Sequence, residues 1–309
     1  MELVGQTFFF QWEVSLMEWL QSVLPASLIS VISAFSMFGE ELLIVLVLGF
    51  LYWCSDKEKA KQIGLNVLMV NVWNPMIKNV ALRRRPYMDH EGIRILRVVD
   101  SSADPMNISA QGYSMPSGHS SNASSLYGSL AGAFRKKWLY IAACVVCVLV
   151  GFSRVVVGAH YPTDVMCGWL LGLITILLVS ALNRCIKSRP LFYAVLLLSG
   201  LPGFFYCRST DFFSGYGMLV GFIAGMAVEE RFVRFENTRS PLRAILRVVC
   251  GAALFFAFNT LLKLPFKSEF LDSGTFAALM VRCARYAIIT FIEFALYPML
   301  FKYTAKIGK

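Results

Sequence analysis

Residues 138–183 read WLYIAACVVCVLVGFSRVVVGAHYPTDVMCGWLLGLITILLVSALN, two long apolar runs joined by a short polar connector. Each run approaches the roughly 20 residues that an α-helix needs to cross the hydrocarbon core of a bilayer. Arg154, His160 and Asp164 lie where the two runs meet. Ionisable groups are unfavourable beside lipid and usually mark a functional site there. The stretch therefore predicts two membrane-spanning helices that share a polar site at one end.

The whole chain has the composition of a membrane protein. Of its 309 residues, 57% are hydrophobic and only 16% are charged, whereas charged residues make up about 25% of soluble domains. We therefore expect an all-α, polytopic bundle of membrane helices. The first candidate span is the weakest, because Pro25 and several serines interrupt it, and it could lie at the membrane interface instead. The ten candidate spans are 21–38, 40–54, 62–82, 118–134, 138–155, 162–183, 190–207, 212–228, 244–263 and 275–301.

Lysine and arginine residues are distributed unequally between the two sets of connectors. One set, which includes 229–243 and the tail 302–309, holds 16 of them, and the opposite set, which includes the long loop 83–117, holds seven outside the candidate site. Because basic residues accumulate on the cytoplasmic side, we expect the long loop to face outside and both termini to be cytoplasmic. The net charge of +10 fits anionic lipid headgroups, and we expect no nucleic-acid partner.

Two further polar groups fall on the predicted outer side. In KNVALRRRP, residues 78–86, Lys78 and Arg85 are seven residues apart, about two helical turns, so they share one face of a helix. In PSGH, residues 116–119, Ser117 and Gly118 precede an apolar run, which is typical of a helix N-terminus with free backbone N–H groups for an anion.

The three polar groups together form a set that is typical of phosphate chemistry. Three cations without a cluster of carboxylates indicate a bound polyanion and no metal cage. Two histidines can supply a nucleophile and a general acid, which are the groups that phosphoryl transfer requires. The members of the set are Lys78, Arg85, Arg154, Ser117, Gly118, His119, His160 and Asp164.

The same residues resemble the three signature motifs of the type 2 phosphatidic acid phosphatase superfamily. The motifs are Lys78 with Arg85-Pro86, Pro116-Ser117-Gly118-His119, and Ser153-Arg154 with His160 and Asp164. The resemblance covers about residues 20–183, which implies a phosphatase core of six spans in residues 1–183. Residues 184–309 would then hold about four additional spans of unknown role. The chain is also similar to bacterial undecaprenyl-diphosphatases and to members near the sphingosine-1-phosphate phosphatases.

The resemblance implies a role for each site residue. His160 attacks phosphorus and becomes a phosphohistidine, Asp164 orients its imidazole, and His119 donates a proton to the leaving oxygen. The phosphoryl oxygens are held by Lys78, Arg85, Arg154, Ser117 and Gly118. The resemblance implies no cofactor and no metal.

Arg83 and Arg84 flank the first motif and have two readings. They can anchor the outer interface, or they can contact the second phosphate of a diphosphate substrate. The sequence therefore marks them as possible substrate contacts.

We expect an integral membrane hydrolase of a lipid phosphate or isoprenoid diphosphate, with membrane lipids as its surroundings and its active site facing outside the plasma (inner) membrane. One alternative is the same chemistry on a soluble phosphate ester such as a sugar phosphate. Another is a lipid or phosphate transporter that uses the additional spans. The sequence does not predict an oligomeric state.

Overall fold

The computed structural model describes residues 5–304, and the regular structure in this range is helical. The expected all-α class is therefore confirmed. Gln6 and Arg83 pair in an isolated parallel bridge within the described residues. The predicted cytoplasmic termini fall partly on residues 1–4 and 305–309, which lie outside the described residues.

The chain divides into two compact units, each described here by itself. The first unit combines residues 1–44 with 73–180, and the second combines 45–72 with 181–309. Helices α3, α4 and α9 run across the boundaries between these ranges. The helices that lie in or begin in the first unit are α1 (Gln11–Val23), α2 (Ala26–Ala34), η1 (Phe35–Gly39), α3 (Glu41–Phe50), α5 (Pro86–Asp89), α6 (Ile108–Gln111), α7 (Gly118–Phe134), α8 (Lys137–Val156) and α9 (Pro162–Cys185).

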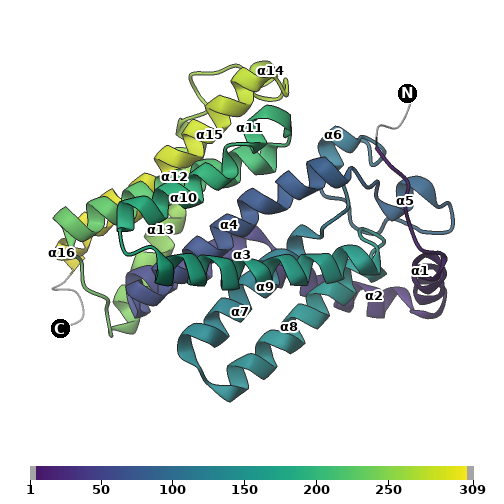
Figure 1. Cartoon of the computed structure of the whole chain (residues 1–309), viewed down its shortest axis with the longest axis horizontal. Helices are drawn as coiled ribbons and strands as arrows, with labels where there is room; N and C mark the ends of the chain where they lie inside the picture. The colour runs from purple at the N-terminus through teal and green to yellow at the C-terminus, as the bar shows by residue number, and fades with distance from the viewer. Residues whose placement is uncertain (1–4, 305–309) are drawn as a thin grey trace. The chain divides into compact units, whose positions relative to one another are not determined.

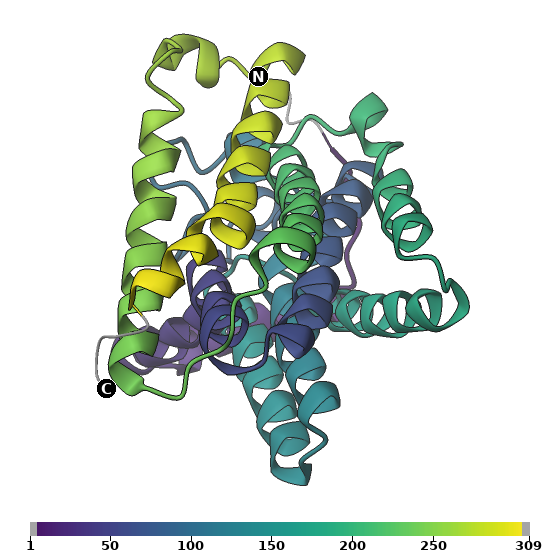
Figure 2. The same cartoon turned by 90° about the vertical axis from the view of Figure 1, so that its left-hand side faces the viewer.

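In the first unit, α7 and α8 form an antiparallel hairpin that can be followed in Figures 1 and 2. α7 ends where Arg135 adopts a left-handed backbone conformation with a φ of 52°, and α8 begins two residues later. Pro162 then occupies the first position of α9, where its fixed φ suits a helix start and its missing N–H leaves no hydrogen bond unmade. The predicted break between 155 and 162 thus separates α8 from α9.

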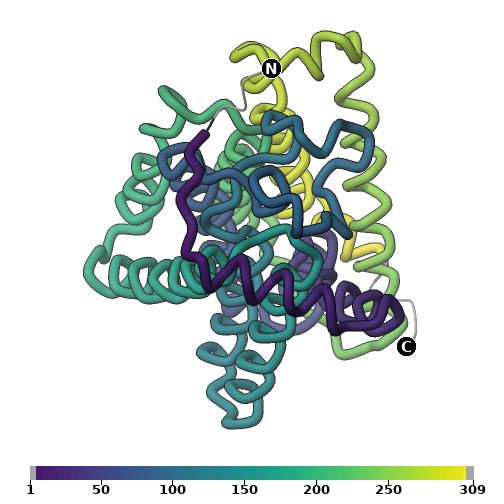
Figure 3. The backbone as a smooth tube through the Cα atoms, turned by 90° about the vertical axis from the view of Figure 1, so that its right-hand side faces the viewer, coloured from purple at the N-terminus to yellow at the C-terminus, as the bar shows by residue number. Residues whose placement is uncertain are grey.

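Helices α1 and α2 meet at a sharp bend of 118°. Pro25 follows Leu24, whose backbone is extended, as expected of a residue before proline. Figure 3 shows α1 from the side and α2 nearly end-on beyond the bend. The predicted span 21–38 therefore begins in the last turn of α1 and continues through α2 and η1.

A hydrophobic core in the first unit joins α1 to the connector between α8 and α9. Met17 on α1 packs in one cluster with Val155, Val156 and Tyr161, all of them buried. The apolar residues before His160 therefore pack inside the protein and fix the position of the connector.

The second unit is built around α12 and α15, which pack closely side by side (Figures 1 and 2). A Cβ added at Gly217 or Gly221 would lie 2.2 Å from a backbone oxygen of α15, so the two glycines allow this close approach. The helices that lie in or begin in this unit are η2 (Leu51–Ser55), α4 (Lys57–Ala81), α10 (Arg189–Gly200), α11 (Gly203–Tyr206), α12 (Thr210–Val228), η3 (Glu229–Val233), α13 (Pro241–Leu261), α14 (Ser268–Leu271), α15 (Phe276–Phe291), η4 (Ile292–Leu296), η5 (Tyr297–Leu300) and α16 (Phe301–Thr304).

Four helical segments of the described chain are long and apolar enough to cross a membrane, which suggests an integral membrane protein. They are Lys137–Val156, Pro162–Cys185, Thr210–Val233 and Pro241–Leu261, and the bent pair of α1 with α2 and η1 makes five if it is one span. α7 and α15, with 17 and 16 residues, are shorter than a typical span of about 20 residues. The count of six plus four spans stays a prediction.

Candidate active site

His160 lies in the connector between α8 and α9, and a glycine shapes that connector. Gly158 has a φ of +78°, and a Cβ at this position would lie 2.4 Å from the carbonyl oxygen of Arg94. The neighbouring Val157 carbonyl accepts a hydrogen bond of 3.0 Å from the amide of Leu96. The long loop therefore holds the connector at a point where only glycine fits without strain.

The His160 side chain is 2% exposed and lies between an arginine and a carboxylate. Nη1 of Arg85 is 3.4 Å from Nε2 of His160, and Nδ1 is 3.6 Å from Oδ2 of Asp164. Because a guanidinium can only donate, Nε2 is the acceptor in the first contact. The ring proton of the neutral imidazole then sits on Nδ1, which faces Asp164, and Nε2 keeps its lone pair.

Asp164 is itself held by a buried network. Its Oδ2 accepts hydrogen bonds from the hydroxyl of Ser114 and from the amide of Tyr161, the latter at 2.8 Å. Its Oδ1 is 2.6 Å from Nη1 of Arg83, whose Nη2 is 2.8 Å from Oε2 of Glu13. Glu13, Arg83 and Asp164 thus form a continuous chain of ion pairs, and each of the three side chains is at most 1% exposed.

Every guanidinium nitrogen of Arg83 has a protein partner. Besides the two carboxylates, Nη1 donates to the Thr163 hydroxyl at 2.7 Å and Nε donates to the Phe8 carbonyl at 2.8 Å. The hydroxyl and the amide of Thr163 both donate to Oε1 of Glu13, at 2.6 and 3.0 Å. These contacts tie the residues around α1 to the start of α9.

Arg85 and Lys78 are placed by the long loop. Arg85 is 3% exposed, and its Nη2 donates to the Gln111 carbonyl at 2.7 Å, while its Nη1 donates to the Ala159 carbonyl at 3.0 Å. Lys78 donates from Nζ to the Tyr113 carbonyl at 2.9 Å. These contacts are made with carbonyl oxygens and with an imidazole, and they fix the positions of the two cations.

The second motif forms the start of α7. Ser117 is the N-cap, its hydroxyl accepts from the amide of Ser120 at 3.4 Å, and its own amide donates to the Asp164 carbonyl at 2.9 Å. Gly118 is the first residue of the helix, and His119 follows with Gly39 of η1 packed against its backbone. The structure therefore joins the second motif directly to the third.

Arg154 is a buried cation with little compensation from the protein. It is 2% exposed, and its Nη1 donates to the hydroxyl of Ser36 at 3.2 Å. Its Nε is buried and has no hydrogen-bond partner, and no carboxylate of residues 5–304 lies within ion-pair distance of it. A buried charge is stable only with a counter-charge, so an anion bound beside Arg154 would supply what the protein does not.

The electrostatic environment keeps His160 neutral. Burial, followed by the positive charges of Arg85, Lys78 and Arg154, lowers the pKa of the His160 imidazole well below its ordinary value. A neutral imidazole has the free lone pair that a nucleophile requires. Of these cations, Arg85 is in direct contact with the ring, at 3.4 Å.

The structure thus gathers the predicted catalytic and phosphate-binding residues in the first unit, and it separates the two flanking arginines. Arg83 contacts Asp164, whereas Nε of Arg84 lies 2.9 Å from Oδ1 of Asp89. No group of three or more metal-ligating side chains is found among the described residues. Sequence reasoning missed Glu13, Ser36 and Ser114; for Glu13 the signal was its place, with Glu18, in the apolar stretch 8–20.

Comparison with known proteins agrees with the motifs. The family model described as PAP2 superfamily matches residues 59–185. An 84-residue segment is 43% identical to phosphatidylglycerophosphatase B of Bacillus subtilis, covering 24% of this chain and 41% of that protein. A 60-residue segment is 47% identical to undecaprenyl-diphosphatase of Sulfolobus acidocaldarius, covering 19% and 29%. Lipid A 1-phosphatase of Rhizobium etli is 33% identical over 81 residues, covering 25% and 34%.

The chain spans less than half the length of each of these curated relatives. No solved structure gives a significant match. A second family model, described as PAP2 superfamily phosphatase, transmembrane extension, matches residues 213–307, which the three motifs left unexplained. The predicted resemblance is therefore confirmed, and the chain belongs to the PAP2 superfamily, with the transmembrane extension of its phosphatases following the motif region.

Proposed function

We propose that the protein is an integral membrane phosphatase that hydrolyses a lipid phosphate or an isoprenoid diphosphate through a phosphohistidine. One observation carries the proposal: His160 lies between the guanidinium of Arg85 and the carboxylate of Asp164. The buried cation Arg154 of the same unit has no carboxylate partner among the described residues. This arrangement suits a nucleophile that must approach a phosphoryl group of high negative charge.

In the first step, the Nε2 lone pair of His160 forms a bond to phosphorus, and the bond between phosphorus and the leaving oxygen breaks. The electron pair of that bond goes to the leaving oxygen, which takes a proton from His119. In the second step, His119 accepts a proton from water, whose oxygen attacks the phosphohistidine and releases phosphate and neutral His160. The phosphoryl oxygens are held by Lys78, Arg85, Arg154, Ser117 and the amide of Gly118.

The network behind Asp164 supports this charge change. Glu13, Arg83 and Asp164 carry two negative charges and one positive charge, a net charge of −1 in their ionised forms. When His160 is phosphorylated at Nε2 and keeps its Nδ1 proton, the ring becomes cationic, and the carboxylate of Asp164 stabilises it. We therefore propose that Arg83 positions Asp164, in place of the predicted contact with a second phosphate. Arg84 stays a predicted possible contact of the substrate.

The relatives support a lipid substrate over a soluble one. The names of the three relatives each specify a phosphatase of a lipid-linked phosphate or diphosphate. We propose that residues 1–183 carry the reaction and that residues 184–309 supply additional membrane helices. The excess of basic residues in the opposite connectors supports a site on the extracytoplasmic side of the plasma membrane.

The proposal is tested by phosphate release from a panel of lipid monophosphates, lipid diphosphates and sugar phosphates, with EDTA present throughout. Because three side-chain cations supply the positive charge, we expect turnover of a lipid substrate to continue in EDTA. His160→Ala should abolish phosphate release. His90→Gln, at the histidine outside the three motifs, should retain it. Turnover by His160→Ala, or a strict requirement for a divalent metal, would contradict the mechanism. A preference for sugar phosphates would favour the soluble-substrate alternative.

The transporter alternative has its own test. Transport of lipid or phosphate by reconstituted His160→Ala protein would show a function that does not use the nucleophile. Loss of both transport and hydrolysis in that variant would leave the phosphatase proposal in place.

A further inference from the structure

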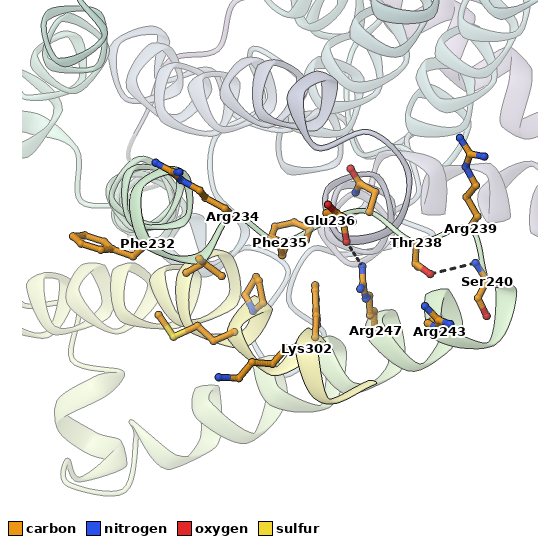
Figure 4. Close-up of a pocket in the computed structure, with 15 residues that line it drawn as sticks. Phe232, Arg234, Phe235, Glu236, Thr238, Arg239, Ser240, Arg243, Arg247 and Lys302 are labelled. Atoms are coloured by element: carbon orange, nitrogen blue, oxygen red, sulfur yellow. Dashed lines mark hydrogen bonds between the residues drawn. The ribbon is translucent and has the colours of Figure 1, made fainter. Parts of the chain in front are cut away.

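The second unit contains a cavity of about 750 Å³ at the junction of η3, the connector 234–240, the first turns of α13 and the η5–α16 segment. Figure 4 shows this cavity, with the connector above it and α13 below. Its volume is typical of a pocket that binds a small molecule or a headgroup. The residues of the three phosphatase motifs belong to the first unit, so this cavity is separate from the proposed active site in sequence and in structural unit.

The lining of the cavity is strongly basic. Five cations and one carboxylate, that of Glu236, contribute to it. Arg243 and Arg247 are four residues apart and so share one face of α13, as Figure 4 shows. The other three cations are exposed at the edge of the cavity; they are Arg234, Arg239 and Lys302.

Arg247 is buried in the wall of the cavity, and its charge has no carboxylate partner among the described residues. It is 7% exposed, and its Nη1 donates to the Trp53 carbonyl at 2.5 Å and to the Glu236 carbonyl at 3.0 Å. Its Nε is buried without a partner, its guanidinium lies 4.0 Å from the centre of the Phe301 ring, and no carboxylate of the described residues forms an ion pair with it. Such a cation is unfavourable unless an anion joins it.

The start of α13 adds a second attraction for an anion. Ser240 is the N-cap, and its hydroxyl makes no capping hydrogen bond to the helix. The dipole of this 21-residue helix favours negative charge at the same end that carries Arg243. The orphaned Nε of Arg247 is an independent sign that the position lacks a ligand.

We propose that this basic cavity is a second anion site, which binds a phosphate group through Arg243, Arg247 and the N-terminus of α13. The phosphate can belong to a phospholipid headgroup or be free in solution. Phe232 and Met299 are exposed apolar side chains in the lining and offer a surface to the glycerol and acyl chains of a lipid. The connector 229–243 is also part of the basic set, which is predicted to face the anionic cytoplasmic leaflet.

Binding is measured with purified protein and two probes, phosphatidylglycerol diluted in phosphatidylcholine nanodiscs and inorganic phosphate in phosphatidylcholine nanodiscs. Phosphatidylglycerol is a phosphodiester and has no terminal phosphate, which is the group that the proposed reaction removes. The variant is Arg243→Gln, and the matched control is Arg231→Gln, an exposed arginine of the same region that does not line the cavity. The catalytic residues are intact in both proteins, so their contribution to phosphate binding cancels in the comparison.

We expect Arg243→Gln to weaken binding of phosphatidylglycerol about tenfold, as for the loss of one charge-assisted hydrogen bond, and Arg231→Gln to leave it within about twofold. An effect on phosphatidylglycerol alone identifies a lipid headgroup, and an equal effect on inorganic phosphate identifies free phosphate. Arg243→Lys should recover most of the affinity. Equal binding by Arg243→Gln and Arg231→Gln would overturn the proposal. Lys302→Gln, at the exposed edge, supplies the same comparison with an expected loss of about threefold if Arg243→Gln does not fold.

Discussion

Arg83 and Arg84 are adjacent in the sequence but have different partners, and this difference leads to a test. Arg83 is enclosed by Glu13 and Asp164, whereas Arg84 pairs with Asp89. Because Arg83 acts through Asp164, we expect Arg83→Ala to lower kcat roughly 10- to 100-fold with little change in KM, the range for residues that orient a functional side chain. The loss should be equal on matched lipid mono- and diphosphates, measured by phosphate release.

The controls for this prediction come from the same network. Arg83→Lys keeps a charge near Asp164 and should recover part of the activity, and Glu13→Gln should lower kcat in the same direction as Arg83→Ala. Arg84→Ala should affect diphosphates more than monophosphates if Arg84 contacts the second phosphate. A loss in Arg83→Ala that is confined to diphosphates would restore the reading of Arg83 as a substrate contact.

The pH dependence of the reaction follows from the environment of His160. The neutral imidazole is the reactive form, and burial with the charges of Arg85, Lys78 and Arg154 lowers its pKa. The ring therefore stays neutral as the pH falls through its ordinary pKa of about 6.5, and activity is lost only at lower pH. We expect the acid limb of kcat/KM, which reports the free enzyme, to be centred below about pH 6.5.

A substitution checks the cause of this shift. Arg85→Gln removes the largest of the charge contributions, so the pKa of His160 should rise and the acid limb should move to higher pH, while the overall rate falls. The pH profile of the residual activity measures the movement. An acid limb that stays at the same pH in Arg85→Gln would assign it to another group.

At the scale of helices, α7 and α9 bring the second and third motifs together through two glycines of α9. A Cβ at Gly168 would lie 2.7 Å from the Ser117 carbonyl oxygen, and one at Gly172 would lie 1.8 Å from the Ser124 hydroxyl and 2.8 Å from the Ser121 carbonyl. The hydroxyl can rotate away, but the carbonyl belongs to the helix backbone. This spacing of two small residues is a known device for close helix contact in membranes.

We expect Gly172→Ala to separate the helices and to cost about 1–3 kcal/mol of stability, as overpacking does. Both the melting temperature in detergent and the rate of phosphate release should fall, because the amide of Ser117 and the carbonyl of Asp164 are paired across this contact. Gly132→Ala, on α7, is the control: an added Cβ there meets no atom within 4 Å, so helix propensity should leave stability equal or higher. Equal melting temperatures for the two variants would contradict the close contact.

Local sequence patterns predicted these helices and motifs well, but they predicted poorly the contacts that support them. Ser117 and Pro162 mark helix starts through their own chemistry, and Lys78 with Arg85 follows helical spacing, so each could be read from a few neighbouring residues. Glu13 could not, because it contacts Thr163 from 150 residues away. Helix α1 carries two carboxylates, of which Glu13 is buried and Glu18 is exposed. Which of the two is paired, and with which residue, depends on tertiary packing.

At the scale of the whole molecule, hydropathy predicted a helical membrane protein, but it did not predict how the chain divides. Each compact unit is formed from two separate stretches of the chain, since residues 45–72 belong with 181–309. Periodicity reports burial along one helix and contains no information about which distant helix lies beside it. The candidate spans α8 and α9 were predicted almost to the residue because their apolar runs are uninterrupted, whereas the bend at Pro25 made the first segment ambiguous.

The last prediction concerns the side of the membrane on which the active site opens. The basic connectors hold 16 lysines and arginines against seven on the other side, and this asymmetry determines orientation in the membrane. Single cysteines are placed at Ser102, an exposed residue of the long loop, and at the exposed Arg231, after replacement of the exposed native cysteines Cys144, Cys185 and Cys250. A membrane-impermeant maleimide should label Ser102→Cys in intact cells and label Arg231→Cys only after permeabilisation. The reverse pattern would put the phosphatase motifs at the cytoplasmic face, where lipid phosphates of the inner leaflet would be the substrates. Labelling of both positions in intact cells would contradict the assignment of the two loops to opposite sides.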